Sequence, residues 1–384
     1  MARAPKSSPA EEAAAPVADW RVRTVRPDES FSPPGPGPMM EHDPEWLLAI
    51  RHPGHGEVLL AEKDERYLPI QVHDGALSFV LGGIAVRRID IRRHVLTGNL
   101  PDWSREDLIA ILRSLRGHLG RNGVVFLIGV VENEPLWQAL QDPELRCNYR
   151  VLQSGATDAR RTIRLGADFD EYLASIPRNH RKDLKRRENR FEREFGGQSE
   201  VRVLTGQDEI KRFLEEVAPV SRRTYQSRLL KLGVGPGGAL ERQLVAAANR
   251  GQARCYGLYV DGEVIAWRIG FLFKGRYFSH HVGFDPDYAA WTPGLVLHIK
   301  SIRDFASLNI WVEEIDLLHG DNPAKRKLAN AMRREGKFYL FPRTWRGTAQ
   351  YLALKWFNAV SDGLTGIASR LGIREWARKR LRQR

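Results

Sequence analysis

The segment from residue 277 to residue 325 constrains the fold of this chain more than any other. In order, it predicts a strand, a polar loop, a helix, a second strand and the start of a second helix. Thr292 is a preferred N-cap residue, and Pro293 has a φ angle already suited to the first helical position. Apolar residues then recur every three or four positions up to Phe305, so a helix should begin at this proline and bury one face.

Gly294 follows the proline and removes a side chain from the predicted helix start. Free backbone N–H groups point outward there, so a phosphate can approach them closely. The same Thr-Pro-Gly sequence is also an ordinary way to begin a helix. The motif alone therefore leaves both an anion site and a plain helix start open.

The flanking sequence extends this pattern into a domain. Apolar or β-branched runs at residues 254–260, 264–273 and 276–284 are separated by Asp261-Gly262-Glu263 and Lys274-Gly275, which are hairpin signals, so they predict an antiparallel meander. A strand at 200–204 and amphipathic segments at 208–225 and 238–250 precede it. A strand at 312–318, a helix at 323–332 and a strand at 337–342 follow. The predicted order is β-α-α-β-β-β-α-β-α-β.

With this order, several short motifs give the chain a family resemblance. They are Gly283-Phe284-Asp285-Pro286, Thr292-Pro293-Gly294, Ile315-Asp316-Leu317-Leu318, Gly320-Asp321 and Lys325. The chain resembles the GNAT acyltransferase superfamily, and within it the FemAB-like branch that includes the CelD-type cellulose and exopolysaccharide biosynthesis proteins.

The sequence departs from the pattern of that branch at three positions. Members typically show a Gly-Tyr-Asp loop, a Ser-Pro-Gly helix start and a Gly-x-x-x-Tyr-Lys helix entry. Here Phe284 stands for the first Tyr, Thr292 for the Ser, and Ala324 for the Tyr before Lys325. The alternating-glycine pyrophosphate loop of stricter GNAT sequences is also absent. A role that needs a phenol beside Lys325 therefore has no residue to perform it.

The resemblance implies acetyl-CoA or another acyl-CoA as co-substrate, and no metal. The residues that it assigns to this co-substrate are Gly283, Phe284, Thr292, Pro293, Gly294, Leu295 and Lys325. Positive side chains should add to the phosphate affinity, so Lys300 is a further candidate. Acyl transfer to an amine also needs a proton acceptor. The catalytic candidates are His281, Asp285 and Asp316, and the residues predicted to bind substrate are Arg181, Lys185 and His280.

A structural role remains open for each of these candidates. His280 and His281 are adjacent on a predicted strand, so they should face opposite sides and only one should line a given cleft. Histidine titrates near neutral pH, yet a strand histidine is also a common packed residue. Asp316 lies on a predicted buried strand, where a carboxylate is costly unless it is paired. It is therefore either a structural or a catalytic residue.

The chain of 384 residues is long enough for two domains. The predicted class is α/β with a mixed sheet, built from two tandem GNAT-like halves and a basic C-terminal helix. In the first half, strands are expected at 57–61, 67–72, 77–81, 124–131, 149–153 and 161–165, and helices at 44–50 and 102–119. The predicted parts are a disordered tail at 1–40, a degenerate N-terminal GNAT-like half at 41–166, a basic helical connector at 167–197, a C-terminal GNAT-like acyltransferase domain at 198–345 and a basic amphipathic helix at 346–384.

The formal net charge of +13 is concentrated in two segments. Residues 178–193 hold eight Lys or Arg against three acids, and residues 343–384 hold ten against two, which together account for the whole excess. These two basic segments could bind acidic partners. A charged helix can also be simply a solvent-exposed helix without a binding role. The connector could face an anionic substrate or tRNA, and the C-terminal helix could lie on an anionic membrane or pack on its own domain through Ala353, Phe357 and Val360.

These features predict an N-acyltransferase that moves an acyl group from acyl-CoA to an amine acceptor, with polysaccharide or cell-envelope precursors as one acceptor class. The alternatives are a FemAB-like transferase that uses aminoacyl-tRNA, and a non-catalytic binding protein with the same fold. No apolar run reaches the length of a membrane span, and Cys147 and Cys255 lack metal-ligand spacing. A cytoplasmic setting is expected, and the oligomeric state is not predicted.

Overall fold

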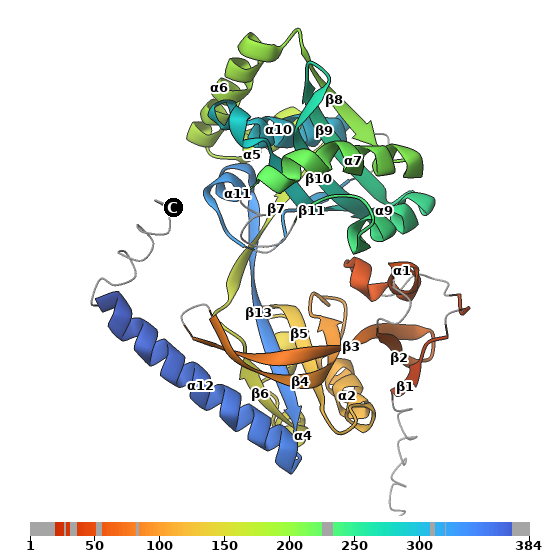
Figure 1. The fold of residues 1–384 in the computed structure, drawn as a ribbon. Coiled ribbons are helices and arrows are strands. Elements are labelled where there is room, and N and C mark those ends of the chain that lie inside the picture. Colours follow the sequence, from red (N-terminus) through yellow and green to blue (C-terminus); the bar gives the residue numbers. More distant parts are fainter. Residues whose placement is uncertain are drawn as a thin grey trace, which may run out of the picture.

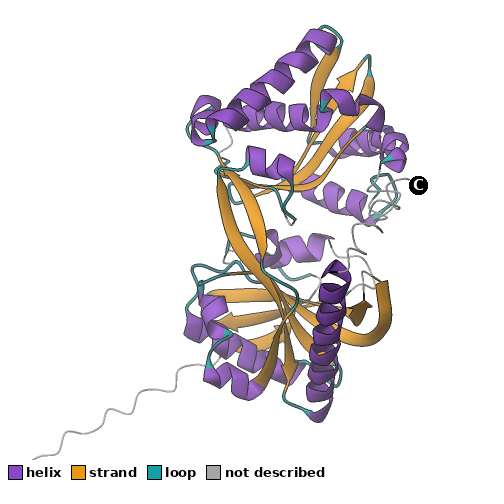
Figure 2. Ribbon diagram, turned by 90° about the vertical axis from the view of Figure 1, so that its left-hand side faces the viewer, coloured by secondary structure: helices purple, strands orange, loops and turns teal. Residues whose placement is uncertain are grey.

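One mixed sheet of 13 strands runs through the computed structural model, in the order β1-β2-β3-β4-β5-β13-β7-β12-β11-β10-β9-β8, with β6 paired to β13. Figures 1 and 2 show two lobes joined by long strands, with helices packed around both lobes. The structure describes residues 20–26, 28–30, 37–50, 56–81, 84–224, 233–307, 312–318 and 320–370.

The second half contains the predicted meander and its helices. Its strands are β8 (Ser199–Leu204), β9 (Ala253–Val260), β10 (Glu263–Phe273), β11 (Arg276–Phe284) and β12 (Glu314–Asp316). Its helices are α5 (Phe169–Ser175), α6 (Arg178–Phe195), α7 (Gln207–Arg223), α9 (Ala239–Asn249), α10 (Pro293–Ser307) and α11 (Pro323–Leu328), with a 3-10 turn η3 (Pro286–Trp291). Strands β9, β10 and β11 pair antiparallel, and β12 returns parallel to β11. The predicted order of elements is thus confirmed.

The first half repeats this connectivity. Its strands are β1 (Arg21–Thr24), β2 (Glu57–Lys63), β3 (Arg66–Leu81), β4 (Ile84–Thr97), β5 (Gly123–Val131), β6 (Tyr149–Gln153) and β7 (Asp158–Arg164). Its helices are α1 (Pro44–Ile50), α2 (Arg105–Leu115), α3 (Pro135–Ala139) and α4 (Pro143–Asn148), with 3-10 turns η1 (Met40–His42) and η2 (Arg116–His118). Strands β2, β3 and β4 form an antiparallel meander, and β5 returns parallel to β4 after α2. This is the β-β-β-α-β order of the second half, as expected for tandem halves.

Two strands cross the predicted domain boundaries. β13 (Ala331–Pro342) pairs through its first residues with β7, and through its last residues with β5 and β6. β7, from the first half of the sequence, in turn pairs with β12 of the second half. Cuts at residues 166 and 345 therefore do not separate two independent sheets, because hydrogen bonds between segments distant in sequence join them.

Three sequence predictions need correction. Residues 20–24 are not a disordered tail, because β1 pairs with β2 and Trp20 is buried against the first core; residues 1–19 lie outside the described part. The sequence predicted separate strands at 67–72 and 77–81, but β3 is continuous through both. Strand β4 was not predicted, because arginines interrupt its apolar residues. Residues 167–197 are no connector. Tyr172, Leu184 and Phe191 are buried in the core of the second half and anchor α5 and α6 to it.

The segment that contains α1 also packs on the second half. Trp46 meets Phe271 of β10 edge-on, with ring centroids 5.2 Å apart. Buried Asp43 forms an ion pair with Arg250 at 3.2 Å. His42 precedes it and is fully buried: its Nε2 lies 3.1 Å from the Thr97 carbonyl oxygen, and its Nδ1 accepts from the Met39 N–H. The two bonds together require a neutral imidazole.

Stability should fall on acidification through His42. Burial lowers the pKa of His42 to about 4 from an ordinary value near 6.5. The unfolded chain therefore binds the extra proton between these values, so this contribution is present above pH 6.5 and is lost as the pH falls toward 4, to a total of about 3 kcal/mol. Urea denaturation at several pH values should show a smaller loss for His42→Gln than for the unsubstituted protein. Equal losses in both proteins would contradict this assignment.

The last described helix, α12 (Trp345–Arg370), packs on the first half (Figure 1). Leu354 is buried, and Tyr351 and Phe357 pack beside it against Phe79 and Phe341 of the sheet. The helix therefore covers its own domain, which was one of the two expectations for it. Of the residues expected to make this contact only Phe357 does so, because Ala353 and Val360 are exposed. No helix in the described ranges is long and apolar enough to cross a membrane.

Candidate functional site

A cleft opens where β11 and β12 diverge. The two strands pair in parallel only over Arg276–Phe278 and Glu314–Asp316. Within the described sheet, β11 then continues to Phe284 with β10 as its one partner, so its other edge is open. The equivalent strands of the first half stay paired to the end of β4, from Arg92 to Thr97. The first half therefore has no matching opening between these strands.

The outer part of the cleft is a cavity of about 660 Å³ beside the start of α10. Five of the seven residues predicted to hold the co-substrate line it: Gly283, Phe284, Thr292, Gly294 and Leu295. Phe284 is 41% exposed and, with Val282, forms an apolar wall. The geometry thus brings together residues from the end of a strand and the start of a helix.

The helix start has an unusual conformation. Pro293 opens α10 as predicted, but Thr292 is in the left-handed region with φ 53°, instead of the extended form of an ordinary N-cap. Its carbonyl oxygen accepts from the N–H groups of Leu295 and Val296, at 3.0 and 3.2 Å. An added Cβ at Gly294 would lie 3.3 Å from Cδ1 of Phe284. The missing side chain therefore keeps the first helical turn open to the cavity.

Two basic residues line the same cavity: Arg187, which belongs to the basic segment expected to face an anionic partner, and Lys327, which was not predicted. Arg187 comes from α6 and Lys327 from α11. Both contact Asp183, at 3.1 and 2.6 Å. Hydrogen bonds from Lys327, and then from Arg187 and Arg186, hold the pKa of Asp183 far below its usual range despite some desolvation. The two cations are thus held beside the cavity by one carboxylate. The basic run of α6 indicated Arg187, whereas only the meeting of α6 and α11 reveals Lys327.

A smaller cavity of about 210 Å³, called here the inner cavity, adjoins the first, called the outer cavity. The two share four lining residues: Val282, His298, Asn322 and Ala324. Its lining includes His280 and His298 as proton acceptors and Lys325 as a cation. Lys325 Nζ donates to the Leu318 carbonyl oxygen at 3.2 Å. The predicted Lys325 therefore faces the inner cavity, and His298 is a residue that the sequence prediction missed.

Both histidines of the inner cavity are neutral at pH 7. His280 is solvent-accessible through the cleft, yet desolvation by surrounding protein lowers its pKa to about 4, with a smaller effect from His281. Burial lowers the pKa of His298 well below 6.5, and the charges of Arg268 and Lys325 lower it further. In the described part of the chain, His298 Nδ1 has no hydrogen-bond partner. This nitrogen is buried within the protein.

The relation of His280 to His281 differs from the sequence prediction. The pairing of β11 with β10 has a bulge at this point, opposite Ile269 and Gly270. The bulge adds one residue to the strand and rotates the side chains, so the two imidazole centroids lie only 4.8 Å apart. His280, and not the predicted His281, is the one of this pair that lines the inner cavity.

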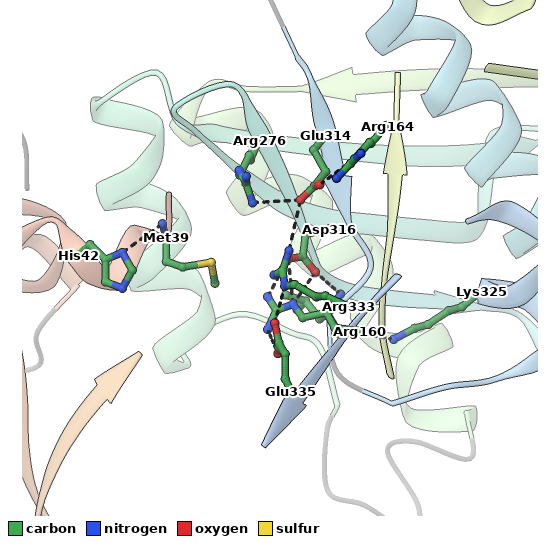
Figure 3. A network of polar contacts seen from close by, with 11 residues as sticks. Met39, His42, Arg160, Arg164, Arg276, Glu314, Asp316, Lys325, Arg333 and Glu335 are labelled. Atoms are coloured by element: carbon green, nitrogen blue, oxygen red, sulfur yellow. Dashed lines mark hydrogen bonds and ion pairs between the residues drawn. The ribbon is translucent and has the colours of Figure 1, made fainter. Parts of the chain in front are cut away.

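Asp316 is held in a buried ion network (Figure 3). Arg160 donates from Nε to both carboxylate oxygens at 2.9 Å, and Arg333 approaches to 3.2 Å. Burial would raise the pKa of Asp316, but the charge and hydrogen bonds of Arg160 outweigh it and leave the pKa lowered. Glu335 binds the same two arginines. Asp316 is thus fully paired within the sheet and lines neither cavity, so the geometry does not support the catalytic prediction.

Four other predicted residues line neither cavity. Asp285 caps η3 and forms an ion pair with Arg223 at 2.5 Å. Lys300 binds Glu192 of α6 at 2.5 Å, and Arg181 reaches toward the carbonyl oxygens that end α5. Lys185 is exposed on α6 and lines neither cavity. These four assignments are therefore not supported by the geometry.

Three acidic residues of α6 contact neighbouring helices, whereas Glu194 and most of its basic residues are exposed. Asp183, Glu188 and Glu192 bind Lys327, Arg303 and Lys300 of the neighbouring helices. The exposed side chains include a basic set: Arg178, Lys182, Lys185, Arg186, Arg190 and Arg193. The helix thus presents a positive surface next to the outer cavity, to which it contributes Arg187.

Residues 178–326, from α6 into α11, match the family model of the acetyltransferase (GNAT) domain. The chain carries a GNAT acetyltransferase domain. The segment includes the whole meander and every lining residue of the two cavities except Lys327 and Leu328, so the GNAT domain is the half in which β11 and β12 diverge. No curated protein matches the sequence.

Solved structures with a similar fold span both halves. A crystal structure of FemX has a TM-score of 0.58 at 10% identity, over 79% of this chain and 92% of that one. A tandem GNAT protein from the clavulanic acid biosynthesis pathway has a TM-score of 0.45 at 12% identity, over 84% and 98%. At these identities the FemX likeness shows a shared fold. In the described part of the chain, no three His, Cys, Asp or Glu side chains group as metal ligands.

Proposed function

We propose that the GNAT domain transfers an acyl group from acyl-CoA to an amine. The observation that carries this proposal is the open edge of β11 beside the first turn of α10, at a cleft lined by Gly294. A strand edge offers backbone groups to an extended amide-containing arm, and a helix start offers N–H groups to a pyrophosphate. Both lie on one cavity, in the order that a CoA molecule needs.

The residues present suit such a molecule. A volume of about 660 Å³ is within the range of small-molecule sites. Val282 and Phe284 give the apolar wall that a pantetheine arm requires, and Arg187 and Lys327 add positive charge near the helix start. Thr292 and Gly294 leave the first turn accessible. The cavity therefore combines apolar and cationic contacts in the places where the two ends of the donor need them.

When bound, acyl-CoA would supply the activated acyl carbon. The acceptor nitrogen forms the new bond to that carbon, the carbon–sulfur bond breaks, and the nitrogen loses a proton. His280 and His298 line the inner cavity as neutral bases and can take this proton. The ammonium group of Lys325, held by Leu318, can stabilise the negative charge that develops on the leaving sulfur. Because Ala324 carries no phenol, the histidines and Lys325 carry this proton chemistry.

The exposed basic face of α6 favours a second candidate, in which aminoacyl-tRNA is the donor. A phosphate backbone would meet Arg186 and Arg190 on the same helix that lines the outer cavity. This donor would present its own adenosine and ester at the cleft, so the same cavity would serve it. A non-catalytic binding protein is the third alternative, and it would show donor binding without turnover.

Ligand-dependent thermal stability separates the donors. A ligand that binds only the folded chain raises Tm, and at 100 times its Kd it adds about 2.7 kcal/mol. We expect acetyl-CoA and CoA to raise Tm and bulk tRNA to leave it unchanged at moderate salt. Release of free CoA in the presence of a panel of amines would then identify turnover.

Each outcome has a definite meaning for the proposal. A shift with tRNA alone, lost steeply as salt increases, would replace acyl-CoA with the aminoacyl donor. A shift with neither ligand would remove the pyrophosphate assignment of α10. A shift with CoA but no turnover with any amine would favour the binding protein.

A further inference from the structure

Helix α12 has two apolar faces, and only one of them is covered. Leu354 and Phe357 point toward the sheet of the first half. On the opposite side, the described part of the helix exposes Trp345, Leu352, Trp356 and Val360. Trp345 is 76% exposed and Trp356 is 70% exposed, which is far from the usual burial of a tryptophan.

These exposed residues follow one helical stripe. Steps of seven, four and four residues at 100° each return to nearly the same side of the helix. Ala349, Ala353 and Ala359 fill the positions between them and are also exposed. The stripe, named here the outer stripe (Trp345, Ala349, Leu352, Ala353, Trp356, Ala359 and Val360), is roughly 22 Å long at 1.5 Å per residue. No polar side chain interrupts it.

The surroundings of the outer stripe are basic. Residues 343–361 contain Arg343, Arg346 and Lys355 and no Asp or Glu. The sequence that follows at 371–384, outside the described part, holds six Lys or Arg against one Glu. A like-charged second copy would be repelled by such a surface, whereas an anionic surface would be attracted.

The end of the β3–β4 hairpin adds to this surface. The Ser361 hydroxyl of α12 donates a hydrogen bond to the Val80 carbonyl oxygen at 3.1 Å. This bond places the hairpin beside the helix. Val80 and Val86 are exposed apolar residues of the hairpin, and Arg87 and Arg88 follow as exposed cations. Apolar side chains are thus flanked by basic ones on two separate elements.

We propose that the outer stripe docks the protein on the surface of an anionic lipid membrane. Tryptophan side chains favour the headgroup level, where the ring contacts acyl chains and the indole N–H contacts polar groups. Arg346 and Lys355 at the two margins of the stripe would lie against lipid phosphates. The covered face keeps α12 fixed on its domain, so the helix would lie in the plane of the interface. This proposal does not depend on the proposed acyl transfer.

Vesicle flotation of the full chain tests the proposal. We expect binding to phosphatidylcholine vesicles that contain phosphatidylglycerol, weaker binding at high salt, and little binding to phosphatidylcholine alone. The double substitution Trp345→Ser with Trp356→Ser should weaken binding by about tenfold or more, because two large apolar side chains no longer enter the interface. A matched double variant, Val203→Thr with Met332→Thr, removes two exposed apolar side chains outside the stripe and should bind like the unsubstituted chain.

Three results would overturn the assignment. The chain could fail to bind anionic vesicles at low salt. It could bind them equally well after the tryptophan substitutions, which would transfer the effect to the basic sequence alone. Light scattering could instead show a dimer that the tryptophan substitutions dissociate, which would assign the stripe to a second copy of the chain.

Discussion

Replacing Gly294 by Trp is expected to abolish the rise in Tm that acetyl-CoA causes. A Cβ at this position lies 3.3 Å from the ring of Phe284, so the indole must turn into the outer cavity and occupy the space beside the first turn of α10. The full stabilisation of about 2.7 kcal/mol at 100 times Kd should disappear. The Tm of the free variant should change little, because Gly294 borders a cavity and not a packed core.

Gly197→Trp is the matched control for this experiment. A Cβ at Gly197 meets no atom within 4 Å, and this glycine lines neither cavity. The control should keep the full shift with acetyl-CoA. If Gly294→Trp also keeps it, the co-substrate does not use the start of α10, and the proposed site is wrong even where the fold is right.

Neutralising Asp316 should be the most destabilising single change in the polar interior. Asp316→Asn leaves the guanidinium groups of Arg160 and Arg333 beside a neutral amide, and both Asp316 and Arg160 are buried. Removing one partner of a buried ion pair typically costs about 3–5 kcal/mol. Urea denaturation should show this loss in the free energy of unfolding.

Glu132→Gln provides the comparison for the buried pair. Glu132 meets Arg334 at 2.9 Å, but both side chains contact solvent, and such pairs contribute about 0–1 kcal/mol. A loss for Asp316→Asn no larger than that for Glu132→Gln would show that the network is not a structural element. It would then reopen a direct role for Asp316 in the chemistry.

Local sequence signals were sufficient for much of the second half. The hairpin turns and apolar runs correctly predicted the meander, and Pro293 correctly predicted the start of α10. Each of these signals acts within a few residues. β4 was missed for a local reason. Arg87, Arg88 and Arg92 are exposed and Arg93 is partly buried. The buried Ile91, His94 and Leu96 are spaced by three and two residues, so the strand shows no strict alternation.

The functions of charged residues depended on distant partners and could not be predicted in the same way. Asp316 matched a family motif, yet its partner Arg160 lies 156 residues away in the sequence. Lys300 was expected at a phosphate, but Glu192 of α6 binds it. Arg187 and Lys327 reach the cleft only because α6 and α11 meet there. Residue type and spacing along the sequence do not indicate these contacts between distant segments.

Strand β13, which pairs with strands of both lobes, couples the unfolding of one lobe to that of the other. Its first residues pair with β7 beside the acetyltransferase sheet, and its last residues pair with β5 and β6 of the other lobe. The segment 178–326 alone would lack both β7 and β13, and Ile163 of β7 would leave a gap in its core. Neither lobe can then be excised or melted without exposing the other, so the two should lose their structure as a single cooperative unit.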